Sequence, residues 1–164
     1  FHRKHRKTPP FQVETLIGPD RFLFSQADSI PAMLHEAVET IRTGLPVAPP
    51  DVVDTLLQRE RLMTTALGMG VAMPHAPLAG IDEIESLFVL LRIPLDWNAF
   101  DTRPVDIVVV TLFPDHNRRR YLLWVREVAR LLRDADTRDA LRHAESPETA
   151  SVVLRDRQRQ LSEG

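Results

Sequence analysis

Two nearly uninterrupted apolar segments constrain the fold of this chain more than any other feature of the sequence. Residues 86–93 read Ser-Leu-Phe-Val-Leu-Leu-Arg-Ile, and residues 105–113 read Val-Asp-Ile-Val-Val-Val-Thr-Leu-Phe. Strands covered on both faces show such runs, whereas strands with one face in water alternate apolar and polar residues. The second segment is too short to cross a bilayer, which takes about 20 residues. The sequence therefore predicts two strands buried inside a layered domain.

Helical periodicity is visible in the segments around these strands. Apolar residues recur at helical spacing from Ile30 to Ile41, and Pro31 stands at an early helix position, where its missing N–H costs little. Further helices are expected over 51–61, 119–134, 137–143 and 147–154, and short strands over 22–25 and 71–73. Strands that alternate with helices predict an α/β fold, with a mixed, mostly parallel central sheet flanked by helices.

The composition narrows the class of protein further. Hydrophobic residues make up 43% and charged residues 27% of the 164 residues, which excludes disordered, collagen-like and coiled-coil chains. The length suits one domain, which we place at residues 11–155, with a C-terminal tail over 156–164. The absence of cysteine excludes disulfides, zinc–thiolate sites and thiol nucleophiles, and fits a cytoplasmic location. The histidines show no metal-ligand spacing, so we expect neither a metal nor another cofactor.

The first ten residues are basic, whereas the rest of the chain is acidic. Residues 2–7 read His-Arg-Lys-His-Arg-Lys, and the chain beyond residue 10 carries 17 positive and 23 negative charges. An acidic body argues against broad nucleic-acid binding. Residues 1–10 have three interpretations: a flexible solvated tail, a juxtamembrane flank on the cytoplasmic side, or a nucleic-acid-binding arm. The second would place the domain at the cytoplasmic face of the inner membrane, within a larger protein.

His75 is the candidate nucleophile of the sequence. It follows Pro74, which fixes its own φ at about −65° and biases Met73 toward an extended conformation. The imidazole is therefore expected at the exit of a short strand, on a stiff backbone. Neutral imidazole is a good nucleophile near pH 7. A histidine after a proline is also a common polar turn residue, so this pattern leaves both interpretations open.

Anion donors precede this histidine in the sequence. Arg59 and Arg61 could supply guanidinium groups, Thr64 and Thr65 hydroxyls, and Gly70 a close backbone N–H. Together with a nucleophilic imidazole, such donors are typical of a phosphoryl acceptor. The alternative for each is structural, since arginines near a helix C-terminus complement its dipole and threonines satisfy nearby backbone groups.

The same stretch resembles the phosphorylation-site motif of type 2 EIIA domains of the bacterial phosphoenolpyruvate-dependent phosphotransferase system. That family includes fructose, mannitol and nitrogen-regulatory EIIA domains. Its pattern is matched by Glu60, by Leu67 and Gly68, and by the run Val71-Ala-Met-Pro-His-Ala76, with every position satisfied. The resemblance extends over roughly residues 11–155. It implies the fold of the mannitol EIIA domain.

The resemblance also implies a function, that of a histidine phosphotransferase component. In the family, the histidine matched by His75 takes a phosphoryl group from the carrier protein HPr and passes it to an EIIB-type domain, often to a cysteine. The position matched by Arg59 helps to hold the phosphoryl group, and a hydroxyl near Thr65 lies close to it. We expect Gly70 to be a local donor. Because this chain has no cysteine, a thiol acceptor must lie on another domain or protein.

The sequence departs from the family pattern on the opposite side of the expected site. Many members have a second histidine at the start of the helix after the last strand, where this chain has Tyr121. His116, Arg119 and Arg120 are the candidates to replace it. Two other functions stay open: a regulatory or sensory EIIA-like domain attached to the cytoplasmic end of a membrane transporter, and a structural domain whose His75 is not phosphorylated.

Overall fold

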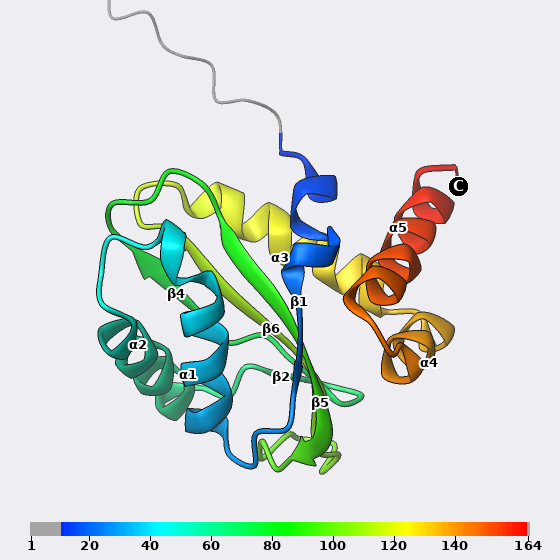
Figure 1. Ribbon diagram of the computed structural model, residues 1–164, viewed down its shortest axis with the longest axis horizontal. Helices are drawn as coiled ribbons and strands as arrows, with labels where there is room; N and C mark the ends of the chain where they lie inside the picture. Colours follow the sequence, from blue (N-terminus) through cyan, green and yellow to red (C-terminus); the bar gives the residue numbers. More distant parts are fainter. Residues whose placement is uncertain (1–10, 164) are drawn as a thin grey trace, which may run out of the picture.

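The two apolar segments are the central strands of a six-stranded sheet in the computed structural model, which describes residues 11–163 (Figure 1). The strands are β1 (Phe22–Ser25), β2 (Ala66–Gly68), β3 (Val71–Ala72), β4 (His75–Leu78), β5 (Glu85–Leu95) and β6 (Val105–Pro114). They are ordered β1-β5-β6-β3-β2, and β4 also pairs with β6. The predicted mixed sheet is confirmed. Its parallel pairings involve the short strands, whereas the long pair β5–β6 is antiparallel.

The helices cover both faces of this sheet (Figure 1). They are α1 (Ile30–Ile41), α2 (Pro49–Leu62), α3 (Arg118–Leu132), α4 (Ala135–His143) and α5 (Pro147–Glu163), with 3₁₀ turns at Val13–Leu16, Pro19–Arg21 and Arg42–Gly44. Side chains of Ser29, Asn117 and Asp134 cap α1, α3 and α4 by accepting backbone N–H groups. The caps explain why these three helices begin where they do.

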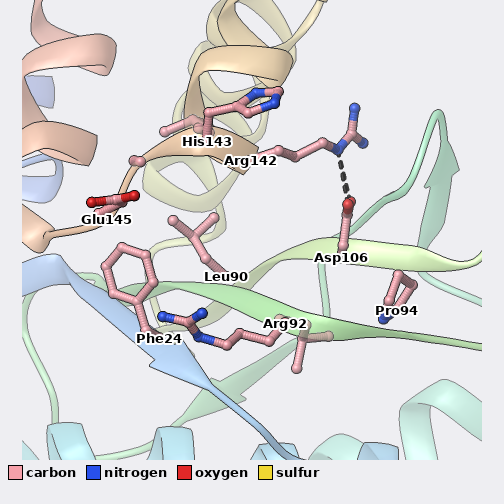
Figure 2. Close-up of a pocket in the computed structure, with 11 residues that line it drawn as sticks. Phe24, Leu90, Arg92, Pro94, Asp106, Arg142, His143 and Glu145 are labelled. Atoms are coloured by element: carbon pink, nitrogen blue, oxygen red, sulfur yellow. Dashed lines mark hydrogen bonds and ion pairs between the residues drawn. The ribbon is translucent and has the colours of Figure 1, made fainter.

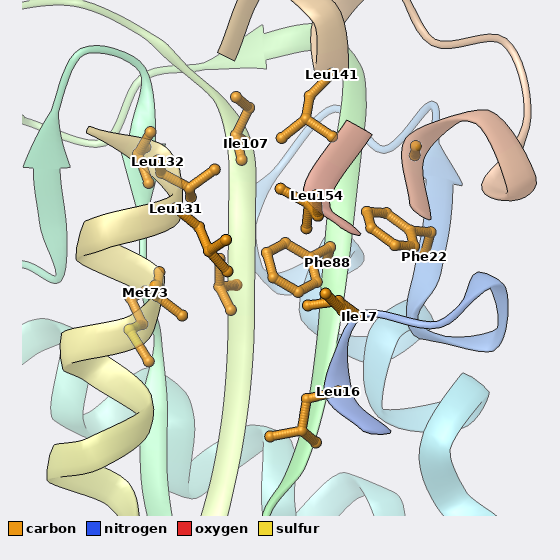
Figure 3. Close-up of a cluster of buried hydrophobic side chains, with 14 of the residues drawn as sticks. Leu16, Ile17, Phe22, Met73, Phe88, Ile107, Leu131, Leu132, Leu141 and Leu154 are labelled. Carbon is orange, nitrogen blue, oxygen red and sulfur yellow. The ribbon is translucent and has the colours of Figure 1, made fainter. Parts of the chain in front are cut away.

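The alternation of side chains along β5 and β6 divides the core into two clusters. Phe88 and Ile107 point to the face covered by α3, α4 and α5, where they meet Trp124 (Figure 3 shows this side). Val89 and Val108, the next residue of each strand, point to the face covered by α1 and α2. Successive residues of a strand face opposite sides, so a strand with two covered faces needs an uninterrupted apolar run. The sequence-based prediction of buried strands is confirmed.

Several element boundaries differ from the prediction. Helix α2 begins at Pro49 rather than at residue 51, and the strands β2 and β4 were not expected. Helix α5 continues to Glu163, so the segment predicted as a C-terminal tail is helical there. This last turn is held by Leu161, which packs on the core, and by Gln158, whose Nε2 donates to Glu14 Oε1 at 3.0 Å.

The basic segment over 1–10 lies outside the described residues. Over residues 11–163, no helix combines the length and apolarity that crossing a bilayer requires.

Candidate functional site

His75 is the first residue of β4 and pairs with Thr111 of the central strand β6. The backbone before it is fixed by two hydrogen bonds: Thr111 N donates to Pro74 O at 2.9 Å, and Met73 N donates to Thr65 O at 3.0 Å. The half-buried imidazole has its Nδ1 2.8 Å from the Met73 carbonyl oxygen. A carbonyl can only accept, so Nδ1 carries the ring proton and Nε2 keeps a free lone pair.

A cavity of about 340 Å³ lies in front of this imidazole. Its walls come from the end of α2, the segment before β3, and α3; they are Arg59, Leu62, Met63, Thr64, Thr65, Leu67, Met73, His75, Tyr121 and Val125. The sequence-predicted residues Arg59, Thr65 and His75 therefore share one cavity. Its remaining lining is mostly apolar, and Leu62 and Met63 are 87% and 77% exposed at its rim.

Tyr121 lies on α3, and its ring packs against the His75 imidazole. The centroids of the His75 and Tyr121 rings are 4.9 Å apart, and Phe113 stacks on Tyr121 at 4.4 Å. Burial raises the pKa of the Tyr121 hydroxyl, and the positive charges of Arg118 and Arg59 partly oppose this shift. The phenol is therefore neutral at physiological pH, and the positive charges of two guanidinium groups act on it.

Glu60 organises the wall that contains Thr65. Its carboxylate accepts the Thr65 backbone N–H at 2.9 Å and the Thr65 hydroxyl at 2.7 Å. The same carboxylate accepts the indole N–H of Trp97, from the loop between β5 and β6. The hydroxyl proton of Thr65 is thus donated to Glu60. Thr65 lines the cavity, but in this structure its hydroxyl is not a free donor toward the imidazole.

The structure does not bring the other four predicted site residues into this cavity. Gly70 lies in the β2–β3 turn with φ +78°, where an added Cβ would come within 2.5 Å of Arg142 Nη2. A left-handed conformation and this close approach both require glycine. Its carbonyl accepts the backbone N–H groups of Asp106 and Ile107, each at 3.0 Å. Gly70 therefore shapes the hairpin, and it does not line the His75 cavity.

The arginines of α3 that were expected at the site point in different directions. Arg120 is 5% exposed and pairs with Glu83 at 3.8 Å, beside a separate cavity. Arg119 is exposed outside the cavity, and His116 lies in the preceding loop, 3.5 Å from Asp115. Arg118, which the sequence analysis did not select, is the arginine whose charge reaches Tyr121. Its spacing from Tyr121 is the signal that could have found it, because residues three apart on a helix are neighbours.

A larger cavity of about 630 Å³ lies between α4 and the strands β5 and β6 (Figure 2). Its arginine on α4 is committed to the fold: Arg142 Nε contacts both carboxylate oxygens of Asp106, at 2.9 and 3.0 Å, and Nη2 donates to Met69 O at 2.7 Å. Met69 is the turn residue of the β2–β3 hairpin, and its N–H donates to Asp101. We therefore regard Arg142 as the strut that fixes this hairpin.

The Arg142→Ala variant is expected to loosen the hairpin and to lower the free energy of unfolding by about 1–3 kcal/mol, because it leaves a partly buried carboxylate and a carbonyl without donors. Urea denaturation measures the change. Arg159→Ala is the matched control, since its pair with Asp156 is exposed and should contribute less than about 0.5 kcal/mol. Equal losses in the two variants would contradict the role of Arg142 as a strut.

No group of three or more His, Asp or Glu residues that could hold a metal occurs within residues 11–163. The described cavity instead brings together the His75 imidazole of β4, the Arg59 guanidinium of α2 and the Tyr121 phenol of α3. A nucleophilic imidazole beside such donors is typical of a phosphoryl acceptor. Residues 19–156 match the family model described as "Phosphoenolpyruvate-dependent sugar phosphotransferase system, EIIA 2". The chain belongs to this family, and it is an EIIA phosphocarrier component of that system.

Relatives and solved structures agree with this assignment. The chain is 41% identical over 103 residues to a nitrogen regulatory protein of Bradyrhizobium diazoefficiens, covering 63% of this chain and 67% of the relative. It is 31% identical over 147 residues to a nitrogen regulatory protein of Pseudomonas aeruginosa, covering 88% and 96%.

Among solved structures, the nitrogen regulatory protein IIA-Ntr of Neisseria meningitidis matches with a TM-score of 0.79 and 26% identity, over 87% of this chain and 98% of that one. The IIA mannitol protein of Escherichia coli matches with a TM-score of 0.68 and 18% identity, over 84% and 97%. The expected mannitol EIIA-like fold is therefore confirmed.

Proposed function

We propose that His75 is the phosphorylated residue of this EIIA domain and that Nε2 is the atom that accepts the phosphoryl group. The observation that carries this proposal is the contact between Nδ1 and the Met73 carbonyl, which leaves Nε2 as the unprotonated nitrogen. Of the histidines in the described residues, His75 is the one that lines the cavity shared with Arg59.

The reaction is a transfer between two nitrogens. Nε2 attacks the phosphorus of a donor phosphohistidine, a new N–P bond forms, and the donor's N–P bond breaks. The donor ring, which is protonated on its other nitrogen, takes back the electron pair of the broken bond and leaves as a neutral imidazole. Met73 O keeps the proton on Nδ1 throughout, so the ring needs no separate base. Arg59 at the cavity wall offsets the negative charge of the phosphoryl oxygens.

The partners we propose are an HPr-like phosphocarrier as donor and an EIIB-type domain as acceptor. The exposed Leu62, Met63 and Leu67 at the cavity rim favour a protein partner over a free sugar, because they offer apolar area around the imidazole. One solved structure of this fold is titled as a complex of enzyme IIA mannitol with phosphorylated enzyme IIB, from Escherichia coli. It is 17% identical to this chain, so the likeness is one of fold, and that pairing is the model for the acceptor proposed here.

A second function is favoured by the relatives called nitrogen regulatory proteins. In this case the phosphorylation state of His75 is itself the output, read by a partner that distinguishes the two forms. Such a domain can act alone or attached to the cytoplasmic end of a transporter. The same chemistry at Nε2 serves both functions, and they differ in whether the phosphoryl group moves on to an EIIB-type acceptor.

The test is phosphoryl uptake from phosphoenolpyruvate, with Enzyme I and HPr present, followed by intact mass before and after the reaction. The expected result is one phosphoryl group that is lost in acid and retained in base, as phosphohistidine is. Addition of an EIIB-type protein should remove it if the chain carries flux. A folded sample that gains no mass with HPr from several sources would overturn the proposal.

Arg59 should be required for the rate of this reaction. We expect Arg59→Ala to slow phosphoryl uptake by about 10- to 100-fold, because a charged donor at the developing negative charge is lost. Arg59→Lys should recover part of the rate, since it restores the charge without the planar fork. Arg61→Ala is the control, because Arg61 lies on the same helix end outside the cavity. Quench-flow rates that are equal for Arg59→Ala and Arg61→Ala would remove Arg59 from the site.

A further inference from the structure

Tyr121 has contacts that neither the fold nor the family match assigns to a function. Its ring lies against two others: Phe113 at 4.4 Å with an interplanar angle of 20°, and His75 at 4.9 Å with an angle of 32°. Phe113 is buried in β6, so it gives the tyrosine a fixed support. A side chain held in this way restricts the plane of the imidazole that it contacts.

The hydroxyl of Tyr121 is an available donor. Within residues 11–163 it makes no hydrogen bond, although the residue lines the His75 cavity and is only partly exposed. It is neutral at physiological pH because burial raises its pKa. The charges of Arg59 and Arg118 lie near it, so an anion drawn to these arginines would be close to the phenol as well.

We propose that Tyr121 positions the His75 imidazole with its ring and donates a hydrogen bond from its hydroxyl to the phosphoryl group on Nε2. This inference rests on the proposed phosphorylation of His75. It assigns two groups to α3: the uncharged Tyr121 hydroxyl, which donates, and the Arg118 guanidinium, which stays charged. Neither group is an imidazole that titrates. The charged and titratable groups around the phosphoryl position are then Arg59 from α2, His75 from β4, and Arg118 and Tyr121 from α3.

Tyr121→Phe separates the two roles, because it keeps the stacked ring and removes only the hydroxyl. A donor to the phosphoryl oxygens stabilises their dianionic form and lowers the second phosphoryl pKa. We therefore expect Tyr121→Phe to raise that pKa in phosphorylated His75, measured by ³¹P NMR across pH 5–9, and to slow uptake from phospho-HPr by about tenfold. Tyr121→Leu should slow uptake further, since the ring contact is lost too. Leu122→Ala, on the exposed side of α3, should leave the phosphoryl pKa unchanged.

Chemical phosphorylation separates this inference from the proposed function. Phosphoramidate modifies histidines without Enzyme I or HPr, and the His75 signal is assigned by its loss in a His75→Gln sample. The ³¹P titration can then be run even if the protein partners fail to phosphorylate the chain. An identical phosphoryl pKa in wild type and Tyr121→Phe would overturn the inference. Failure of phosphoramidate to label His75 in the folded protein would overturn it as well.

Discussion

The His75→Gln variant is expected to take up no phosphoryl group in the phosphoenolpyruvate, Enzyme I and HPr assay. Glutamine is near the size of histidine and keeps a polar side chain in the cavity, but it has no nucleophilic nitrogen. The loss should therefore be complete, while the midpoint of urea denaturation stays close to that of the wild type. Intact mass measures the first quantity, and circular dichroism the second.

His143 is the matched control for this experiment. Its Nδ1 lies 2.7 Å from Asp139 O, so in its neutral form Nε2 carries the lone pair, as in neutral His75. It is exposed on α4, beside the other cavity, without the partners that surround His75. His143→Gln should keep full uptake. A mass gain that persists in His75→Gln and disappears in His143→Gln would place the phosphoryl group on His143, at the other cavity. This result would contradict our proposal.

Replacement of Trp124 by alanine is expected to lower the free energy of unfolding by about 3–5 kcal/mol. Trp124 is fully buried, and its ring meets Phe88 edge-on at 6.0 Å in the cluster covered by α3 and α5. The substitution opens a cavity that the β5–β6 sheet is too rigid to fill. A loss of this size is a large share of the roughly 5–15 kcal/mol that stabilises a typical domain.

The conservative variant Trp124→Phe should be much less damaging. The indole N–H donates to Ser86 Oγ at 3.1 Å and is 3.3 Å from Thr111 Oγ1, but these two hydroxyls also contact each other at 3.0 Å. They therefore keep a partner when the indole is gone. Urea denaturation of both variants, beside the exposed control Val152→Ala, measures the difference. Equal losses for Trp124→Ala and Trp124→Phe would show that the hydrogen bond, not the packing, carries the energy.

The elements with strong periodicity were predicted from the sequence, and those defined by tertiary contact were not. The apolar runs of β5 and β6 require two covered faces, and this is what the structure has. The helical end of α5 was not predicted because residues 155–160 are polar. They are held in the helix by contacts with Glu14 and the core, which only the structure shows. Strand β4 was missed because two of its four residues, Pro77 and His75, are not typical strand formers.

The candidate site shows the same division. His75 and Arg59 were found because a local pattern names them, and they share a cavity. Arg119 and Arg120 were selected by closeness in sequence, but each residue of a helix is turned by about 100° from the last. Arg120 is therefore buried beside another cavity, while the arginine of α3 whose charge acts on Tyr121 is Arg118. Gly70 was predicted to be a local donor. Its neighbour in the structure is Arg142, which is too distant in sequence for a local pattern to reveal.

The turn of the β2–β3 hairpin loses a stabilising contact at acid pH, and it loses none at alkaline pH within the physiological range. Met69 is held by two ions of opposite sign, the Asp101 carboxylate on its N–H and the Arg142 guanidinium on its carbonyl. The arginine never loses its charge, whereas the hydrogen bond from Met69 lowers the pKa of Asp101 below its ordinary value. Asp101 therefore supports the turn fully above the pKa of the unfolded chain and loses this contribution only as the pH falls through its lowered value. The β2–β3 turn therefore keeps both of these contacts at every pH near neutrality.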